Sequence, residues 1–319
     1  MNTKFNEMVN LRDAFINDVI QIAQEEDRIV VLDADVGSAT KTWNFREIYP
    51  ERFYEFGIAE QNMFGVAAGL AATGRIPIAA TFAVFASMRA AEMIRTSICY
   101  PKLNVKIIGG YAGLSNGKDG ATHQSVEDIA IMRSFPNLVV MVPSDPMMAR
   151  KIARTAVEYQ GPVYIRMEYE EVPFVYDEDV EFQIGRGLTP KEGSDVTVVS
   201  YGVALIRVIE TAKILSSEGI EVEVIDMPTI KPFDKNLLLQ SVKKTGAIVT
   251  VEDHSVIGGL ASMVSECLIE EGTNPRFRGL GIPDVFTESG TTSKLRDKYG
   301  IGQDAIISVV RDLVEKVGK

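Results

Sequence analysis

The stretch from Leu138 to Arg166, LVVMVPSDPMMARKIARTAVEYQGPVYIR, decides the fold class of this chain. It opens with an apolar, β-branched run that is typical of a strand. The following loop ends at Asp145, a residue type that caps helices, and Pro146 suits the first helical position. A helix is expected as far as Tyr159, and a second strand over Val163–Arg166. This strand–helix–strand order predicts a parallel pair in an α/β sheet.

Comparable β-branched runs lie on both sides of this unit and alternate with segments of helical period. They are Ile29–Leu32, Val105–Ile108, Val196–Val199, Val222–Ile225 and Ala247–Val251. We therefore expect an α/β protein of two domains, each a mainly parallel sheet flanked by helices.

An acidic, proline-interrupted segment, EYEEVPFVYDEDVE at residues 168–181, separates the two groups of strands. Its weak periodicity and its charge predict a solvated connector. We expect a first domain over residues 1–168, a linker over residues 169–184 and a smaller second domain over residues 185–319.

Composition excludes several classes of function. The 319 residues are 46% hydrophobic and 24% charged, with a formal net charge of -11, which argues against nucleic-acid or anionic-membrane partners. The most apolar stretch, Ile76–Met88, is too short for a membrane helix, and the N-terminus does not resemble a secretory signal. Cys99 and Cys267 have no metal-ligand spacing and are expected to be core thiols, which suits a cytoplasmic protein.

Glu60 is the first residue with a candidate chemical role. It follows Phe56-Gly57-Ile58-Ala59 and opens an Ala/Gly-rich segment that predicts a helix ending near Gly74. A carboxylate in the first turn is favoured by the helix dipole. Such acids are routine at helix starts, so this position alone is compatible with a structural or a functional role.

Two further segments could bind a ligand. Phe82 and Phe85 lie three residues apart, a spacing that lines one side of a helical turn and can stack on a planar ring. Residues 109–124, GGYAGLSNGKDGATHQ, follow a predicted strand and predict a ligand loop that ends near His123. Core aromatics and a structural histidine are the alternatives. Neither GxGxxG nor GxxxxGK[ST] is present, so nothing indicates NAD or ATP binding.

Three motifs in this order, GIAEQNM, TFAVFASM and KDGATHQ, closely resemble the pyrimidine-binding and C-terminal domains of transketolase. The resemblance implies thiamine diphosphate as cofactor and transfer of a two-carbon ketol unit from a ketose to an aldose. Glu60 would hydrogen-bond the aminopyrimidine ring and stabilise the imino form that deprotonates the thiazolium carbon. Phe82 and Phe85 would pack against the pyrimidine, with Ile58 and Met88 beside them.

The same resemblance assigns a catalytic and substrate-binding role to His123 and substrate-binding roles to Asp119 and Tyr111. Arg12 and Arg166 would form a cationic clamp on the terminal anion of the sugar, since arginine forks suit tetrahedral anions. Each arginine could equally form a surface ion pair.

The chain departs from the family pattern at several positions. Tyr111 replaces a usual histidine, Met88 a common third aromatic and Lys118 a usual acid, and the serine of the phosphate loop is shifted or lost near Ser38-Ala39. These departures leave open an ordinary ketose phosphate or a branched or sulfonated sugar as donor.

The family's GDG sequence, which holds magnesium and the diphosphate, does not occur in this chain. The resemblance therefore implies a partner subunit that holds most of the Mg²⁺ site, in a particle with two copies of each subunit. The isolated chain is expected to be inactive, and no metal ligands are assigned to it. The second domain is expected to serve assembly, with His254 in a structural or functional loop.

Two other interpretations remain at this point. One is the beta subunit of a 2-oxo acid dehydrogenase, which shares the domain plan, although the DGATHQ loop favours transketolase. The other is an interaction module without catalysis, which the presence of Glu60, Phe82, Phe85, Asp119 and His123 argues against.

Overall fold

The strand–helix–strand unit predicted from residues 138–166 is present in the computed structural model, which describes residues 7–315. Its elements are β6 (Val139–Met141), α7 (Pro146–Glu158) and β7 (Val163–Arg166). The Asp145 carboxylate caps α7 by accepting a hydrogen bond from the Met148 amide at 2.7 Å. β6 and β7 pair in parallel, so the local prediction is confirmed.

This unit belongs to a seven-stranded sheet of order β12-β6-β7-β5-β4-β2-β3, in which only β12 is antiparallel to its neighbour. The remaining strands are β2 (Ile29–Asp33), β3 (Phe53–Glu55), β4 (Ile76–Phe82), β5 (Lys106–Gly110) and β12 (Thr229–Lys231).

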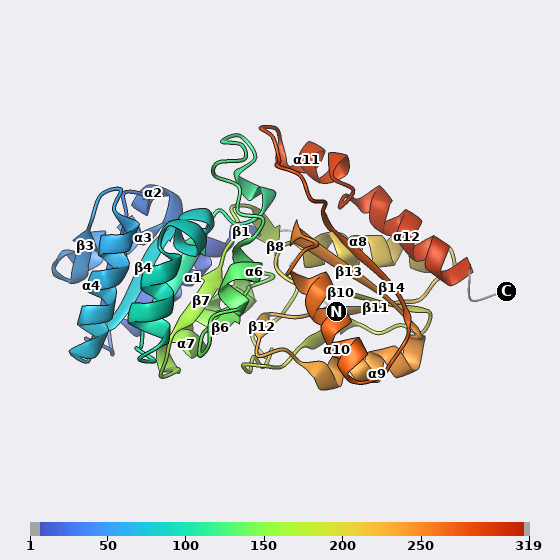
Figure 1. Ribbon diagram of the computed structural model, residues 1–319, viewed down its shortest axis with the longest axis horizontal. Coiled ribbons are helices and arrows are strands. Elements are labelled where there is room, and N and C mark those ends of the chain that lie inside the picture. The colour runs from blue at the N-terminus through green and yellow to red at the C-terminus, as the bar shows by residue number, and fades with distance from the viewer. Residues whose placement is uncertain (1–6, 316–319) are drawn as a thin grey trace.

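Helices cover both faces of this sheet (Figure 1). One face packs on α1 (Leu11–Ile22), α3 (Thr42–Ile48) and α7, and the other on α4 (Glu60–Ala72), α6 (Asp128–Arg133) and the helical segment after β4. That segment comprises π-helical turns at Phe85–Arg89 and Ile94–Cys99 around α5 (Ala91–Met93). Short elements are α2 (Gly37–Thr40) and 3₁₀ turns at Pro50–Arg52 and Leu114–Asn116.

The second domain is built on a five-stranded sheet of order β14-β13-β10-β11-β9, parallel except at β9. Its strands are β9 (Leu188–Lys191), β10 (Val196–Ser200), β11 (Val222–Asp226), β13 (Ala247–Ser255) and β14 (Arg276–Ile282). Its helices are α8 (Ala204–Ser217), α9 (Lys235–Thr245), α10 (Leu260–Glu270), α11 (Thr292–Lys298) and α12 (Gln303–Glu315). The two-domain α/β prediction is confirmed.

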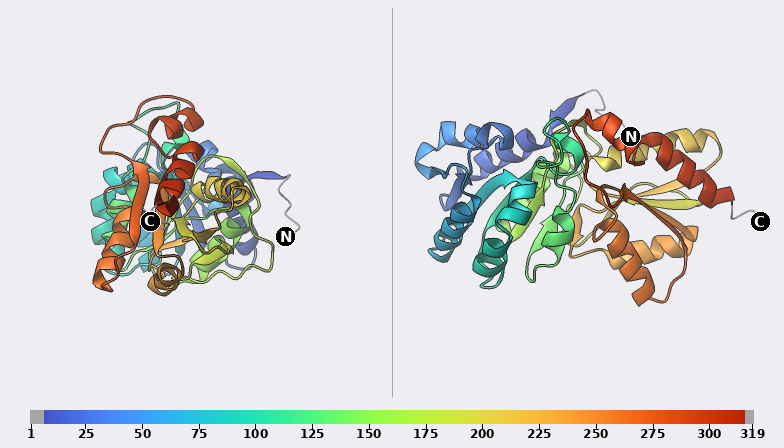
Figure 2. Two further views of the ribbon diagram at one scale, coloured as in Figure 1. Left: turned by 90° about the vertical axis from the view of Figure 1, so that its right-hand side faces the viewer. Right: turned by 45° about the horizontal axis from the view of Figure 1, so that its top comes forward.

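The domains are more closely joined than the sequence suggested. β12 follows β11 in the chain but pairs with β6 of the first sheet, and one core cluster contains side chains from both sheets. Figure 2 shows the second domain against the first from two further directions.

The predicted solvated connector is wrong for part of its length. Glu168 is 1% exposed and Val172 is 5% exposed, and β8 (Glu171–Pro173) pairs antiparallel with β1 (Met8–Asn10). The Asp145 carboxylate also accepts hydrogen bonds from the Val175 and Tyr176 amides. Sequence composition alone did not reveal these long-range partners. The exact domain boundaries stay predictions.

Candidate active site

A pocket of about 610 Å³ lies at the N-terminal end of α4 and is lined by Ile58, Ala59, Glu60, Gln61, Asn62, Phe85 and Arg89. Glu60 is the first residue of α4 and is 7% exposed, where the helix dipole favours its negative charge. Within residues 7–315, its carboxylate has neither a hydrogen bond nor an ion pair. Buried carboxylates normally have a hydrogen-bond partner, so this free carboxylate can accept a hydrogen bond from a ligand.

Phe82 and Phe85 form an aromatic wall, although they do not share a helical turn as predicted. Phe82 ends β4 and Phe85 opens the following π-helical turn. Their ring centroids are 5.9 Å apart with 18° between the planes. The His123 ring meets Phe85 edge-on at 5.4 Å. The structure thus brings Phe82, Phe85 and His123 together from three separate segments.

Tyr111 extends this wall toward the N-terminal helix. Its ring centroid lies 4.6 Å from that of Phe82 and 4.8 Å from that of Tyr169. The Arg12 guanidinium carbon lies 4.9 Å from the Tyr111 ring centroid and 4.5 Å from that of Tyr169. Burial raises the pKa of Tyr111, and the positive charge of Arg12 opposes this rise.

Arg12 is a buried cation without an acidic partner among the described residues. It is 2% exposed. Its Nε donates to Asn10 Oδ1 at 2.9 Å, and its two terminal nitrogens donate to the carbonyls of Ala39 and Tyr169. These neutral acceptors leave the positive charge uncompensated, which makes this position suitable for an anionic ligand group.

Arg166 does not join this cluster, and its predicted place in the sugar clamp needs correction. It is fully buried. Its Nε lies 3.0 Å from Asp128 Oδ2, its Nη1 lies 3.1 Å from Glu168 Oε1, and its Nη2 donates to the Asp253 carbonyl at 2.8 Å. A guanidinium that already contacts two carboxylates is compensated within the chain, which favours a structural role for Arg166 over its predicted place in the sugar clamp.

The other predicted site residues lie on the exposed rim. Asp119 is exposed in the glycine-rich loop, and its charge acts on Tyr111. Ile58 is 82% exposed and Met88 is 46% exposed. Ile58 lines the Glu60 pocket, and Met88 belongs to the π-helical turn that contributes Phe85 and Arg89 to it.

Tyr169 is a contact residue that sequence reasoning missed. Its ring contacts both Tyr111 and Arg12, and it is 47% exposed. It lies directly after Glu168 at the start of the acidic connector, where composition predicted only solvated residues. An aromatic residue within that acidic stretch was the available signal.

His254 belongs to a strand and not to the predicted loop. It lies in β13 and is fully buried. Its Nδ1 is 2.7 Å from the Ser255 carbonyl, and its Nε2 accepts from the Ala130 amide at 3.3 Å. Burial lowers the pKa of His254 to about 4, so the ring is neutral and donates through Nδ1. These contacts assign His254 a structural role.

The cysteines and a second pocket lie outside this site. Cys99 and Cys267 are buried free thiols, as predicted. Between residues 7 and 315, no cluster of three His, Cys, Asp or Glu side chains could hold a metal ion, and no helix has the length and apolarity to cross a membrane.

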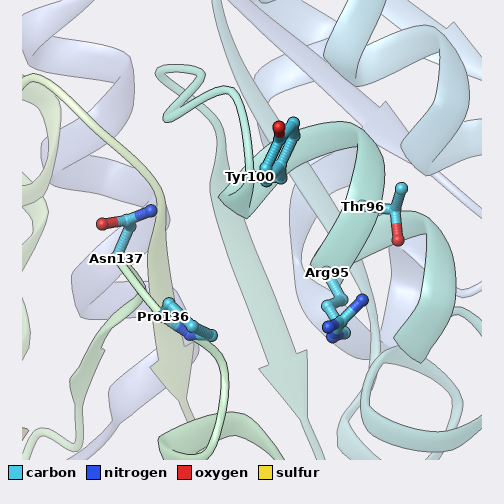
Figure 3. A pocket seen from close by; sticks show the side chains of 5 residues that line it. All are labelled: Arg95, Thr96, Tyr100, Pro136 and Asn137. Atoms are coloured by element: carbon cyan, nitrogen blue, oxygen red, sulfur yellow. The ribbon is translucent and has the colours of Figure 1, made fainter.

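A second pocket of about 330 Å³, lined by Arg95, Thr96, Tyr100, Pro136 and Asn137 (Figure 3), offers neither a carboxylate nor an imidazole.

Comparisons with known proteins agree with this geometry. Residues 7–173 match the transketolase pyrimidine-binding domain, and residues 185–306 match the transketolase C-terminal domain. A putative transketolase C-terminal section of Methanocaldococcus jannaschii is 42% identical over 96% of both chains. A 6-deoxy-6-sulfo-D-fructose transketolase subunit of Clostridium sp. (strain MSTE9) is 39% identical, over 96% of this chain and 95% of that protein.

Among solved structures, an inactive β4 tetramer of a split-gene transketolase is 48% identical with a TM-score of 0.89, covering 96% of this chain and 99% of that chain. The fold thus defines a pyrimidine-binding domain joined to a C-terminal domain, and the chain belongs to the transketolase family. Within that family it is the subunit of a split transketolase that carries the pyrimidine-binding and C-terminal domains.

Proposed function

We propose that this chain binds the pyrimidine ring of thiamine diphosphate and, together with a diphosphate-binding partner subunit, transfers a two-carbon ketol unit from an anionic ketose to an aldose. The observation that carries the proposal is the buried, unpartnered Glu60 carboxylate beside the ring of Phe85. Split-transketolase relatives that match nearly this whole chain support it.

The Glu60 pocket fits an aminopyrimidine. A flat heterocycle with an N–H group needs an acceptor at its edge and apolar contacts on its face. Glu60 supplies the acceptor, and Phe85 in the same pocket supplies the aromatic surface. When bound, thiamine diphosphate supplies a stabilised carbanion. The chain's contribution is to hold a proton between Glu60 and the ring and to orient the ring.

The opposite end of the donor is proposed to lie toward Arg12. Arg12 is a buried cation without an acidic partner among the described residues, and Tyr111 connects it to the aromatic wall through ring contacts. Arg12 is 2% exposed and packs against the rings of Tyr111 and Tyr169, so direct contact with an anion requires a rearrangement of its surroundings. His123 and Asp119 are proposed to contact the hydroxyl groups of the sugar near the reacting carbons.

The partner subunit is proposed to supply the diphosphate and Mg²⁺ ligands, in a cytoplasmic particle with two copies of each subunit. Exposed Ile58 in the Glu60 pocket and exposed Met88 in the adjoining π-helical turn support a surface that a partner covers. The two buried, unpaired cysteines support a reducing compartment.

Calorimetric titration of thiamine diphosphate with Mg²⁺ tests the division of the site. The isolated chain should bind weakly, and tight binding and ketol transfer should both appear after addition of a GDG-containing partner. Tight Mg²⁺-dependent binding by the isolated chain would contradict the proposal.

A sulfonated donor is the second candidate, because a relative that is 39% identical is named a 6-deoxy-6-sulfo-D-fructose transketolase subunit. Tyr111, at the position of a usual histidine, is compatible with a change of donor. Comparing fructose 6-phosphate with 6-deoxy-6-sulfofructose on the reconstituted pair decides between the two anions.

A further inference from the structure

The glycine-rich segment of residues 111–124, here called the substrate loop, carries Tyr111, Asp119 and His123. Hydrogen bonds to the rest of its own domain lie near its two ends. The Ala112 amide donates to the Met167 carbonyl at 3.1 Å, and the Gly113 amide donates to the Ser125 carbonyl at 2.8 Å. The middle of the loop therefore needs support from elsewhere.

One support comes from β13 of the C-terminal domain. The Leu114 amide donates to Asp253 Oδ1 at 3.1 Å. The same fully buried carboxylate accepts from Arg296 Nε at 2.8 Å through Oδ2. Leu114 also belongs to a small core with Val126, Ile282, Leu295 and Ile301, most of which comes from the C-terminal domain.

The second support is the segment Glu288–Gly290, which precedes α11. The Gly290 amide donates to the Gly117 carbonyl at 2.8 Å. Gln124 Nε2 donates to the Glu288 carbonyl at 3.1 Å and to the Gly117 carbonyl at 3.3 Å. Gln124 is 2% exposed, so water cannot readily replace these contacts. Figures 1 and 2 show the two loops side by side at one end of the domain interface.

The packing between these loops is too close for additional side chains. A Cβ atom at Gly117 would lie 2.5 Å from the Gly290 carbonyl oxygen, and one at Gly120 would lie 2.5 Å from Ser289 Oγ. Gly117 is therefore explained by contact with the backbone of the C-terminal domain. Gly120 faces the Ser289 side chain, and its positive φ of 76° is what favours glycine there.

We propose that Glu288–Gly290 is a positioning segment that, through Gln124 and Gly117, holds the neighbouring His123 and Asp119 at the mouth of the active site. The C-terminal domain thus sets the affinity for the ketose donor in addition to any role in assembly. This inference rests on the proposed function for its effect on catalysis, although the contact itself can be tested without it.

The first test replaces Gln124 by methionine, which keeps the side-chain length but removes both donated hydrogen bonds. The matched control is Gln160→Met, because Gln160 is exposed and also donates to a carbonyl, that of Glu158. In the reconstituted pair, Gln124→Met should raise the donor KM about 5- to 20-fold. Its thiamine diphosphate affinity should remain close to that of the control, and its kcat should change less than its donor KM.

The second measurement is amide hydrogen exchange over residues 113–124, which needs no enzymatic activity. Gln124→Met should accelerate exchange there, and Gln160→Met should not. If both exchange and KM match the control, or if exchange accelerates without a change in KM, the positioning role is overturned. Faster exchange together with a wild-type pair that is inactive on every ketose would refute the proposed function but leave the contact intact.

A disulfide across the contact provides a rescue test. A Cβ built at Gly120 lies 3.7 Å from Ser289 Cβ, within the range for disulfides. Because Gly120 has a φ of 76°, a cysteine there is strained, so oxidised and reduced forms of the same Gly120→Cys/Ser289→Cys protein are compared. In the Gln124→Met background, oxidation should return the donor KM toward that of the control. If oxidation leaves the KM raised, the effect arises within the first domain and the proposal fails.

Discussion

Two groups of buried charge in this molecule differ in how they are compensated. In the first domain, Glu60 at the start of α4 and Arg12 in α1 are nearly inaccessible to solvent. Neither has an oppositely charged partner within residues 7–315. At the domain interface, Arg166 contacts Asp128 and Glu168. An uncompensated buried charge is costly to the fold. Next to a pocket or an aromatic wall such a charge indicates a ligand, whereas a compensated charge indicates structure. The buried Lys106, which donates only to Asn104 and to the Tyr159 and Gly161 carbonyls, shows that a buried charge without an acidic partner is not sufficient evidence alone.

The largest expected effect in this comparison is on the unpartnered acid. Glu60→Gln removes the negative charge at similar volume and should lower kcat of the reconstituted pair by about 10²- to 10⁴-fold, the range for proton-transfer groups. Because the change removes an uncompensated buried charge, the melting temperature should be equal to or higher than that of wild type, and subunit pairing should be unchanged. Glu47→Gln is the control, because Glu47 is an exposed residue of α3. A mutant with more than about a tenth of wild-type turnover, a barrier change near 1.4 kcal/mol, would remove Glu60 from the chemistry.

The compensated arginine should show the reverse behaviour. Arg166→Met leaves Asp128 and Glu168 buried without their cation, which typically costs about 3–5 kcal/mol of stability. The urea midpoint should fall sharply. Arg311→Met is the control, since the Arg311–Glu218 pair lies on the surface, and its midpoint should change little. A folded Arg166→Met protein of normal stability with selectively poor use of anionic sugars would restore Arg166 to the sugar clamp.

Arg12 is expected to affect substrates according to their charge. Arg12→Met should lower kcat/KM for fructose 6-phosphate by about 10- to 100-fold, because a hydrogen bond to a charged group is worth about 1.5–3 kcal/mol. Uncharged fructose should be much less affected, since the terminal anion is far from the bond that breaks. The two donors are measured on the same reconstituted enzyme. Equal losses for both would assign Arg12 to the fold or the cofactor.

The difference between the two arginines also shows what sequence could predict. Features that depend on neighbouring residues could be predicted from the sequence. They are the α/β class, the Asp145 cap and the position of Glu60 at a helix start. Arg12 and Arg166 carry the same charge, and the resemblance assigned them the same role. Their environments differ because the Asp128 carboxylate and the Asp253 carbonyl approach Arg166 from 38 and 87 residues away in the chain, in addition to the nearby Glu168 carboxylate. Local sequence patterns do not encode such long-range compensation.

The interface offers a pH-dependent test through His254, which packs near Asp128, Glu252 and Arg166. Its folded-state pKa is about 4, below the ordinary value of 6.5, so the unfolded chain takes up the proton first as pH falls. Stability should therefore decrease from pH 6.5 downward, by about 2 kcal/mol at pH 5 from this group. His254→Gln keeps a donor and an acceptor but does not titrate. Its stability should fall less than that of wild type between pH 6.5 and 5 in urea unfolding, and parallel curves would contradict the assignment.

Tyr169 gives the smallest expected effect. It tests whether the Tyr169 ring supports the Arg12 guanidinium or blocks an anion from reaching it. Its ring contacts Arg12 and Tyr111 but is about half exposed, so its cation–π contact is worth about 0.5–1 kcal/mol. If the ring only supports Arg12, Tyr169→Leu should lower kcat/KM for fructose 6-phosphate about 2- to 5-fold, with little change for fructose. If the ring instead covers Arg12 and must move before an anion binds, the same variant should raise kcat/KM for the phosphate. Tyr100→Leu, a change at an 83% exposed tyrosine in the separate pocket of Figure 3, is the control. An equal effect on both donors would show that Tyr169 shapes the aromatic wall and not the charge selectivity, because only the phosphate donor can sense Arg12 through its terminal anion.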